Sequence, residues 1–190
     1  MKTLALPALL LTAALAVAAC SFERGDVVSS VDGDGSVVTT SSVAIVPPGK
    51  PTVGERYDFS LVSMDGEELS CDTLAGKVVV LDFWATWCGP CVKELPHLRE
   101  LYAEYADDGL EIVGLSFDRS RNRLTKFLGA NDVPWPQVFL TEAQQRQVGE
   151  NTGVTSIPRL FVLDRDGKLV TTQGRGRLDA IIPDLLSAGV

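Results

Sequence analysis

Runs of apolar residues mark the strands of the predicted core. Five segments are rich in Val, Leu, Ile and Phe, a composition that favours strands. The predicted strands are residues 78–84, 110–117, 137–140, 159–164 and 168–173. The first run is apolar almost throughout, which is typical of a strand buried on both faces. Asp166-Gly167 predicts a tight turn between the last two strands.

Helical periodicity occupies the intervals between these strands. Apolar residues recur at steps of three and four after residue 91, as on one face of a helix. This stripe consists of Leu95, Leu98, Tyr102 and Tyr105. Pro96 is expected to kink the helix, and Gly109 is expected to end it. Further helices are predicted at residues 118–131, 142–149 and 178–186, so the chain is predicted to form an α/β fold with a central mixed sheet flanked by helices.

A small β-hairpin is predicted ahead of this sheet. Residues 57–62 alternate loosely between apolar and polar side chains, and residues 64–67 are typical of a turn. Cys71 lies in the connection that follows. We interpret it as a half-buried apolar side chain. The alternative is a partner in an intermolecular disulfide, which requires an exposed thiol.

Residues 1–19 are predicted to be a secretory signal that is removed from the mature protein. Lys2 precedes an apolar stretch, and small residues follow it up to Cys20. The tetrapeptide Val17-Ala18-Ala19-Cys20 resembles a lipobox, whose cysteine is acylated and becomes the mature N-terminus. The alternative is an uncleaved membrane anchor, but the apolar run is short for a span of about 20 residues. We therefore expect Cys20 to be lipidated.

The composition of residues 20–52 shifts to Ser, Thr, Val, Gly, Asp and Pro. With no helical period and no clean alternation, this segment is predicted to be a flexible linker behind the lipidated cysteine. Residues 53–190 are predicted to be the folded domain. The Asp32–Asp34 stretch begins like a calcium loop, but the required glycine and final glutamate are missing. No metal site is expected there.

The formal net charge of −8 argues against a nucleic-acid partner, which requires clustered basic charge. The most basic stretch contains Arg119, Arg121 and Arg123 at the start of a predicted helix. We interpret these arginines as a solvated helix face. Docking of a partner protein is the alternative.

Cys88 and Cys91 are separated by Gly89 and Pro90 where the first core strand gives way to a helix. Two thiols this close together at such a junction are suited to reversible disulfide chemistry. A lone Cys-x-x-Cys is also half of a zinc site, but the chain has no second such pair, and its only histidine, His97, lies in the same helix. Neither a metal nor a cofactor is therefore expected.

The segment DFWATWCGPC resembles the active-site segment of thioredoxins, and its surroundings resemble the TlpA/ResA group of thioredoxin-fold thiol–disulfide oxidoreductases, which is related to the AhpC/TSA group. Pro96 lies at the same offset as a proline of thioredoxins. The resemblance covers residues 53–190. It implies a thioredoxin fold with an N-terminal β-hairpin extension, and a redox-active disulfide between Cys88 and Cys91.

Cys88 is predicted to be the attacking nucleophile of this pair. Its position at a helix N-terminus places backbone N–H groups and the helix dipole near its sulfur, and both favour a thiolate. Cys91 is predicted to be the resolving thiol, which expels the substrate from the mixed disulfide.

The resemblance implies roles for further residues. Asp82 is expected to lie buried beneath the cysteines and to accept a proton from Cys91. Substrate binding is expected to involve Trp87, Gly89, Pro90, Ile157 and Pro158, the last of which corresponds to the cis-proline that faces the disulfide in thioredoxin folds. The ResA resemblance also implies an active-site glutamate after the second strand, but Ser116-Phe117-Asp118-Arg119 supplies none.

These features predict an extracytoplasmic thiol–disulfide oxidoreductase, lipid-anchored on the periplasmic side of the cell envelope, that reduces protein disulfides, for example in cytochrome c maturation or redox homeostasis. Its expected partners are a substrate protein with a disulfide, an upstream membrane thiol donor and the bilayer. One alternative is a peroxiredoxin-like thiol peroxidase, but Leu81 and Ala85 occupy the positions of its characteristic Pro and Thr. The other is a non-enzymatic thioredoxin-fold adaptor, against which the retention of both cysteines argues.

Overall fold

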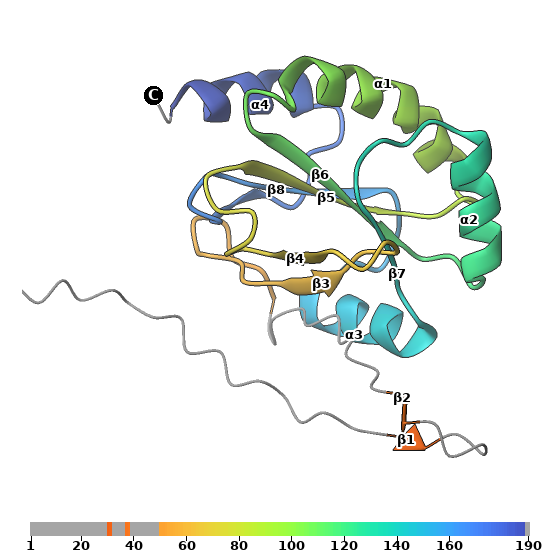
Figure 1. The fold of residues 1–190 in the computed structure, drawn as a ribbon. Coiled ribbons are helices and arrows are strands. Elements are labelled where there is room, and N and C mark those ends of the chain that lie inside the picture. Colours follow the sequence, from red (N-terminus) through yellow and green to blue (C-terminus); the bar gives the residue numbers. More distant parts are fainter. Residues whose placement is uncertain (1–29, 32–36, 39–49, 189–190) are drawn as a thin grey trace, which may run out of the picture. The chain divides into compact units, whose positions relative to one another are not determined.

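The structure is a computed structural model that describes residues 30–31, 37–38 and 50–188 (Figure 1). The predicted signal peptide, Cys20 and most of the predicted linker lie outside the described residues. Strands β1 (Ser30–Val31) and β2 (Val37–Val38) pair antiparallel within that linker. The sequence pattern had predicted no strand there.

The domain is built on a five-stranded sheet with the order β7-β6-β5-β8-β9. Its strands are β5 (Val78–Trp84), β6 (Leu110–Ser116), β7 (Gln137–Phe139), β8 (Arg159–Leu163) and β9 (Leu169–Thr171). The first three strands are parallel, whereas β8 runs antiparallel to both β5 and β9. This arrangement confirms the predicted mixed sheet and the predicted turn between its last two strands.

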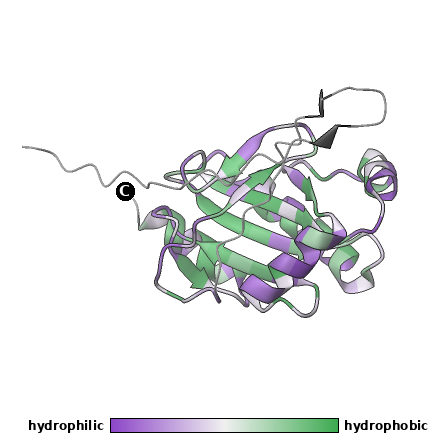
Figure 2. Ribbon diagram, turned by 90° about the horizontal axis from the view of Figure 1, so that it is seen from below, coloured by the Kyte–Doolittle hydropathy of each residue, from purple (hydrophilic) through white to green (hydrophobic). Residues whose placement is uncertain are grey.

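Four helices belong to the same domain, and they lie on both faces of the sheet (Figure 1). They are α1 (Gly89–Tyr105), α2 (Arg121–Ala130), α3 (Glu142–Thr152) and α4 (Leu178–Ser187). In Figure 2 the strands of the central sheet are mostly hydrophobic, whereas the helices combine hydrophobic and hydrophilic stretches. This pattern follows from their positions, because the sheet is covered on both faces and each helix on one. In the described part of the chain, no helix combines the length and the apolar character that crossing a bilayer requires.

The alternation of side chains along β5 divides the core into two layers. Val79, Leu81 and Phe83 point to the layer that contains α3 and the N-terminal hairpin. Val80 and Trp84 point to the other layer, which contains α1, α2 and α4 together with both cysteines of the motif. Because residue 82 shares the direction of residues 80 and 84, the motif and Asp82 lie in the same layer.

The predicted N-terminal hairpin is confirmed. Strands β3 (Ser60–Val62) and β4 (Glu68–Ser70) pair antiparallel, with Leu61 opposite Leu69. Cys71 follows directly, is 9% exposed, and its thiol donates a hydrogen bond to the Tyr57 carbonyl at 2.9 Å. Burial raises the pKa of this thiol to about 11. An intermolecular disulfide needs an exposed thiol, so the structure favours the interpretation of Cys71 as a packed side chain.

Two details of α1 differ from the sequence prediction. The helix ends at Tyr105, with Ala106 as its C-cap, and Gly109 instead closes the following turn with a φ of 103°. The buried stripe continues from Leu98 to Leu101, whereas Tyr102 and Tyr105 are only half-buried. Tyr102 lies at the edge because its hydroxyl donates to the Glu111 carboxylate at 3.1 Å.

Candidate active site around Cys88 and Cys91

Cys88 and Cys91 form a disulfide at the start of α1, with their Cα atoms 5.2 Å apart. Cys88 is the N-cap of the helix, and its sulfur accepts a hydrogen bond from the backbone N–H of Cys91 at 3.3 Å. Pro90 in the first turn has no N–H to contribute. The predicted placement of Cys88 at a helix N-terminus is confirmed, and an N–H directed at its sulfur favours the thiolate once the bond is reduced.

The surface above this disulfide is formed by Trp87 rather than by the sulfurs. In the oxidised state Cys88 and Cys91 are 5% and 3% exposed, whereas Trp87 is 58% exposed. Gly89 and Pro90 are also exposed. Trp84 is buried, and its indole N–H donates to the Gln137 side chain at 3.0 Å. The two tryptophans of the motif therefore differ, with Trp87 at the surface and Trp84 in the core.

Asp82 is buried in the middle of the sheet, 3% exposed, between Gly114 of β6 and Leu160 of β8. Its side chain lies in the layer that contains the disulfide. Burial, with a smaller contribution from the negative charge of Glu94, raises the pKa of this carboxyl to about 8. Asp82 is thus an acid that titrates close to neutral pH beneath the cysteines, as expected from the sequence.

Glu94 is an acidic residue of the site that sequence reasoning missed. It lies three residues after Cys91 on α1, and its side chain is 11% exposed. Arg175, in the loop between β9 and α4, donates to its carboxylate from Nε at 2.6 Å. The acidic neighbour of Asp82 thus comes from the helix, whereas the ResA resemblance implied an active-site glutamate after the second strand, where this chain has none. The spacing from Cys91 is the signal that would have found it, because residues i and i+3 share a helix face.

Asp118 is the second residue that sequence reasoning missed. It is fully buried after β6, and its carboxylate accepts hydrogen bonds from the Thr86 backbone N–H at 3.0 Å and from the Thr86 hydroxyl at 2.6 Å. The Ser116 hydroxyl donates to the same carboxylate at 2.9 Å. Asp118 therefore fixes the loop that carries Trp87 and Cys88.

The opposite side of the site is formed by Ile157 and Pro158. The peptide bond between them is cis, as the resemblance implies. Arg159 is paired with Phe83, so Pro158 lies just past this pair, beside the end of β5 from which the cysteine loop emerges. Ile157 packs against the side-chain cluster that contains both cysteines. The structure therefore places Ile157 with the two cysteines and Pro158 at the same end of β5, whereas the roles of these residues in substrate binding stay a prediction.

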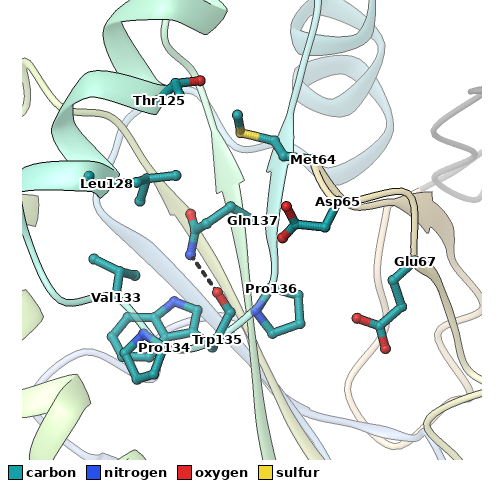
Figure 3. A pocket seen from close by; sticks show the side chains of 11 residues that line it. Met64, Asp65, Glu67, Thr125, Leu128, Val133, Pro134, Trp135, Pro136 and Gln137 are labelled. Atoms are coloured by element: carbon teal, nitrogen blue, oxygen red, sulfur yellow. Dashed lines mark hydrogen bonds between the residues drawn. The ribbon is translucent and has the colours of Figure 1, made fainter.

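A separate cavity of about 500 Å³ lies between the N-terminal hairpin, α2 and the start of β7 (Figure 3). Asp65 and Glu67 from the hairpin and Trp135 from the loop before β7 are among the residues that line it. None of the predicted site residues lines it. The described residues also contain no group of three or more His, Cys, Asp or Glu side chains arranged to hold a metal ion.

Comparison with known proteins places this geometry in a family. Residues 44–179 match the family model described as Redoxin. The chain belongs to the Redoxin family. This Redoxin is 34% identical over 116 residues to the thiol-disulfide oxidoreductase ResA of Bacillus thuringiensis (strain Al Hakam), a match that covers 61% of the chain and 65% of the relative. The chain thus spans just under two thirds of that relative's length.

Two further similarities extend the comparison. The Redoxin is 31% identical over 142 residues to the thiol-disulfide oxidoreductase ResA of Bacillus subtilis (strain 168), covering 73% of the chain and 78% of the relative. Its fold is similar to the solution structure of a thiol:disulfide interchange protein from Bacteroides sp., with a TM-score of 0.60, 26% identity and coverage of 72% and 91% of the two chains. The predicted thioredoxin-like fold and the resemblance to the TlpA/ResA group are confirmed.

Proposed function

We propose that this Redoxin is a thiol–disulfide oxidoreductase that reduces disulfides of protein substrates through Cys88 and Cys91. The observation that carries the proposal is the disulfide at the N-terminus of α1, with the Cys91 N–H directed at the sulfur of Cys88 and a buried carboxyl beneath. Relatives in the same family that are named thiol-disulfide oxidoreductase ResA support it.

The reaction begins with the reduced pair. The Cys88 thiolate attacks one sulfur of the substrate disulfide, and the other substrate sulfur leaves as a thiolate and takes up a proton. Cys91 then loses its proton and attacks the Cys88 sulfur of the mixed disulfide, which releases the second substrate thiolate. Two electrons have then passed to the substrate, its two thiolates take up protons from the solvent, and the Cys88–Cys91 disulfide remains. A dithiol donor protein re-reduces it.

Asp82 is suited to accept the proton of Cys91. A pKa of about 8 leaves part of the carboxyl ionised near neutral pH and makes it a stronger base than an ordinary carboxylate. After the transfer, the neutral acid is the form that a buried site favours. The protonated Asp82 expected in the oxidised protein is therefore the product of this step.

Two features favour reduction of the substrate over its oxidation. They are the dipeptide Gly89-Pro90 between the cysteines and the buried Asp82. Thioredoxin has a potential of about −270 mV, and the oxidant DsbA, whose thiolate is unusually stable, has a potential of about −120 mV. No histidine lies between Cys88 and Cys91, and the ionised fraction of Asp82 opposes a nearby thiolate. The couple is therefore expected to be reducing.

Equilibration of the protein against a glutathione series tests this assignment. We expect a midpoint closer to that of thioredoxin than to that of DsbA, whereas a midpoint above about −180 mV would make the protein an oxidant or isomerase. Trapping with Cys91→Ser identifies the substrate, because the mixed disulfide on Cys88 is no longer resolved. Cys88→Ser is the matched control and should trap none.

The cellular setting is a further part of the proposal. The lipobox-like sequence before Cys20 supports a lipid-anchored protein on the periplasmic side of the cell envelope, with a membrane thiol donor and a role in cytochrome c maturation or redox homeostasis. Mass spectrometry of the mature N-terminus tests the anchor. Cleavage after Ala19 with added acyl mass on Cys20 is expected, and an intact signal or an unmodified cysteine would contradict it.

A further inference from the structure

A cavity beside the disulfide carries positive charge that the proposed exchange reaction does not use. It has a volume of about 420 Å³ and is lined by Trp87, Arg119, Ser120 and Arg123. All four residues are exposed. Among the residues that the structure describes, neither Arg119 nor Arg123 forms an ion pair. Two guanidinium groups next to the exposed indole are thus available to a ligand.

The two walls of this cavity are held together by hydrogen bonds. Thr86 precedes Trp87 on one wall, Asp118 precedes Arg119 on the other, and the Asp118 carboxylate accepts both the backbone N–H and the hydroxyl of Thr86. The backbone segments that carry the indole and Arg119 are therefore held together by a partly buried contact. This preorganisation reduces the entropy lost when a ligand is bound.

The start of α2 adds to the positive potential. Ser120 is the N-cap of this ten-residue helix, and its side chain accepts from the Arg123 N–H at 3.4 Å. The N-terminal end of a helix favours negative charge. Arg121 lies over the Phe139 ring, 5.6 Å from its centroid. An adjoining hollow shares Arg119 and is lined by Glu142, Gln145 and Arg146. Glu142 is the one carboxylate there, and the Arg146 charge offsets it.

We propose that this cavity binds an Asp or Glu side chain that lies a few residues from the reactive cysteine of the protein substrate. The inference rests on the proposed function of Cys88 and Cys91 and adds a preference for acidic substrates to it. The carboxylate accepts charge-assisted hydrogen bonds from Arg119 and Arg123, and the neighbouring chain packs on Trp87. The net charge of −8 repels an acidic protein elsewhere on the surface, so these arginines orient the encounter.

The order of the strands indicates how the substrate chain would cross the site. Strand β8, which begins just after Pro158, flanks β5 on one side, and β6, which leads to Arg119, flanks it on the other. An extended segment that pairs with the backbone at Ile157 and Pro158 and crosses Cys88 continues toward Trp87 and the arginines. The acidic residue is therefore expected on one side of the substrate cysteine only.

The test uses the reduced full-length protein and disulfide-bonded peptides that differ by a single residue. Each peptide places Glu, or Gln as its uncharged match, at successive positions on either side of the cysteine. We expect the Glu peptide to be reduced about threefold to tenfold faster than its Gln match at the productive positions, with the ratio falling as salt is added. The double substitution Arg119→Gln with Arg123→Gln should bring the ratio to about one.

Lys126→Gln is the matched control, since it removes one positive charge from the same helix outside the cavity. It should keep the preference for Glu. Equal rates for Glu and Gln peptides in the unmodified protein would overturn the acidic-substrate inference and leave the proposed function standing. A preference that survives the double substitution would also overturn it. Failure to reduce any peptide would overturn both proposals.

Discussion

The carboxylate of Glu94 accepts a hydrogen bond from the Arg175 guanidinium at 2.6 Å, and its negative charge raises the pKa of the buried acid Asp82. Arg175 comes from the loop before α4, and Glu94 comes from the helix that carries the cysteines. Because Glu94 raises the pKa of Asp82 and Arg175 carries the opposite charge beside Glu94, we expect Arg175, a residue far along the chain, to affect the pKa of Asp82. Arg175 is therefore predicted to balance the charge of Glu94 beside the site.

Opposite shifts are expected when the two members of this pair are changed. Glu94→Gln removes a negative charge near Asp82 and should lower its pKa, whereas Arg175→Gln leaves that charge unbalanced and should raise it, each by about one pH unit or less because Arg175 is half exposed. NMR titration of the Asp82 carboxyl in the oxidised protein measures this directly, since the disulfide cysteines do not titrate. Shifts in the same direction in both variants would contradict the arrangement.

The buried acid should also make the protein less stable as the pH rises. The folded state holds the Asp82 proton up to about pH 8, whereas the unfolded chain releases it near pH 4, so folding binds a proton between these values. Stability from this group is present below pH 4 and is lost toward pH 8, by at most about 1.4 kcal/mol per pH unit. Asp82→Asn should remove this slope. Urea unfolding of the oxidised unmodified protein and the oxidised Asp82→Asn variant at pH 5 and pH 8 measures this difference. If the free energy of unfolding changed with pH equally in both proteins, Asp82 would not be the cause.

Thr86→Val should loosen the active-site loop. The substitution keeps the shape of the side chain but removes a hydroxyl that donates to a buried carboxylate, which should cost about 1.5–3 kcal/mol of unfolding free energy and slow disulfide exchange. Thr125→Val is the control, because that hydroxyl bonds to a carbonyl on the exposed face of α2. It should change stability by no more than about 0.5 kcal/mol. If both variants lost the same unfolding free energy, the hydrogen bond from Thr86 to Asp118 would contribute no more to stability than an exposed one.

Alkylation of the reduced protein near neutral pH should modify Cys88 before Cys91. The reason is the helix N-terminus, where the N–H at 3.3 Å stabilises the thiolate of Cys88. Peptide mapping after a short reaction gives the order of modification. If Cys91 reacted first, the roles of nucleophile and resolving thiol would have to be exchanged.

The sequence predicted the elements of the fold well because their signals are local. The buried run of β5, the turn at Asp166-Gly167 and the pair of cysteines before α1 each lie within a few residues, and the structure has them where they were predicted. Boundaries were less accurate, as at Gly109, since a helix ends where its tertiary contacts end.

The contacts that complete the site were not predictable from local pattern. Glu94 and Arg175 are 81 residues apart, and Thr86 and Asp118 are 32 apart. Both pairs depend on how α4 and β6 are placed against the active-site loop. Asp118 follows an apolar strand, and an acidic residue in that position is most simply interpreted as the start of the next helix. Only its burial in the structure distinguishes it from an exposed residue at a helix start.

Because Cys71 is buried, its thiol can report how often the N-terminal hairpin opens. It is the one cysteine outside the disulfide in the described part of the chain, and it lies under the N-terminal hairpin with its thiol bonded to the Tyr57 carbonyl. A thiol reagent added to the oxidised protein therefore meets no reactive sulfur in that part until the hairpin lifts from the sheet. The rate at which Cys71 is labelled therefore measures how often those openings occur, and it does so with no cysteine having to be introduced into the chain.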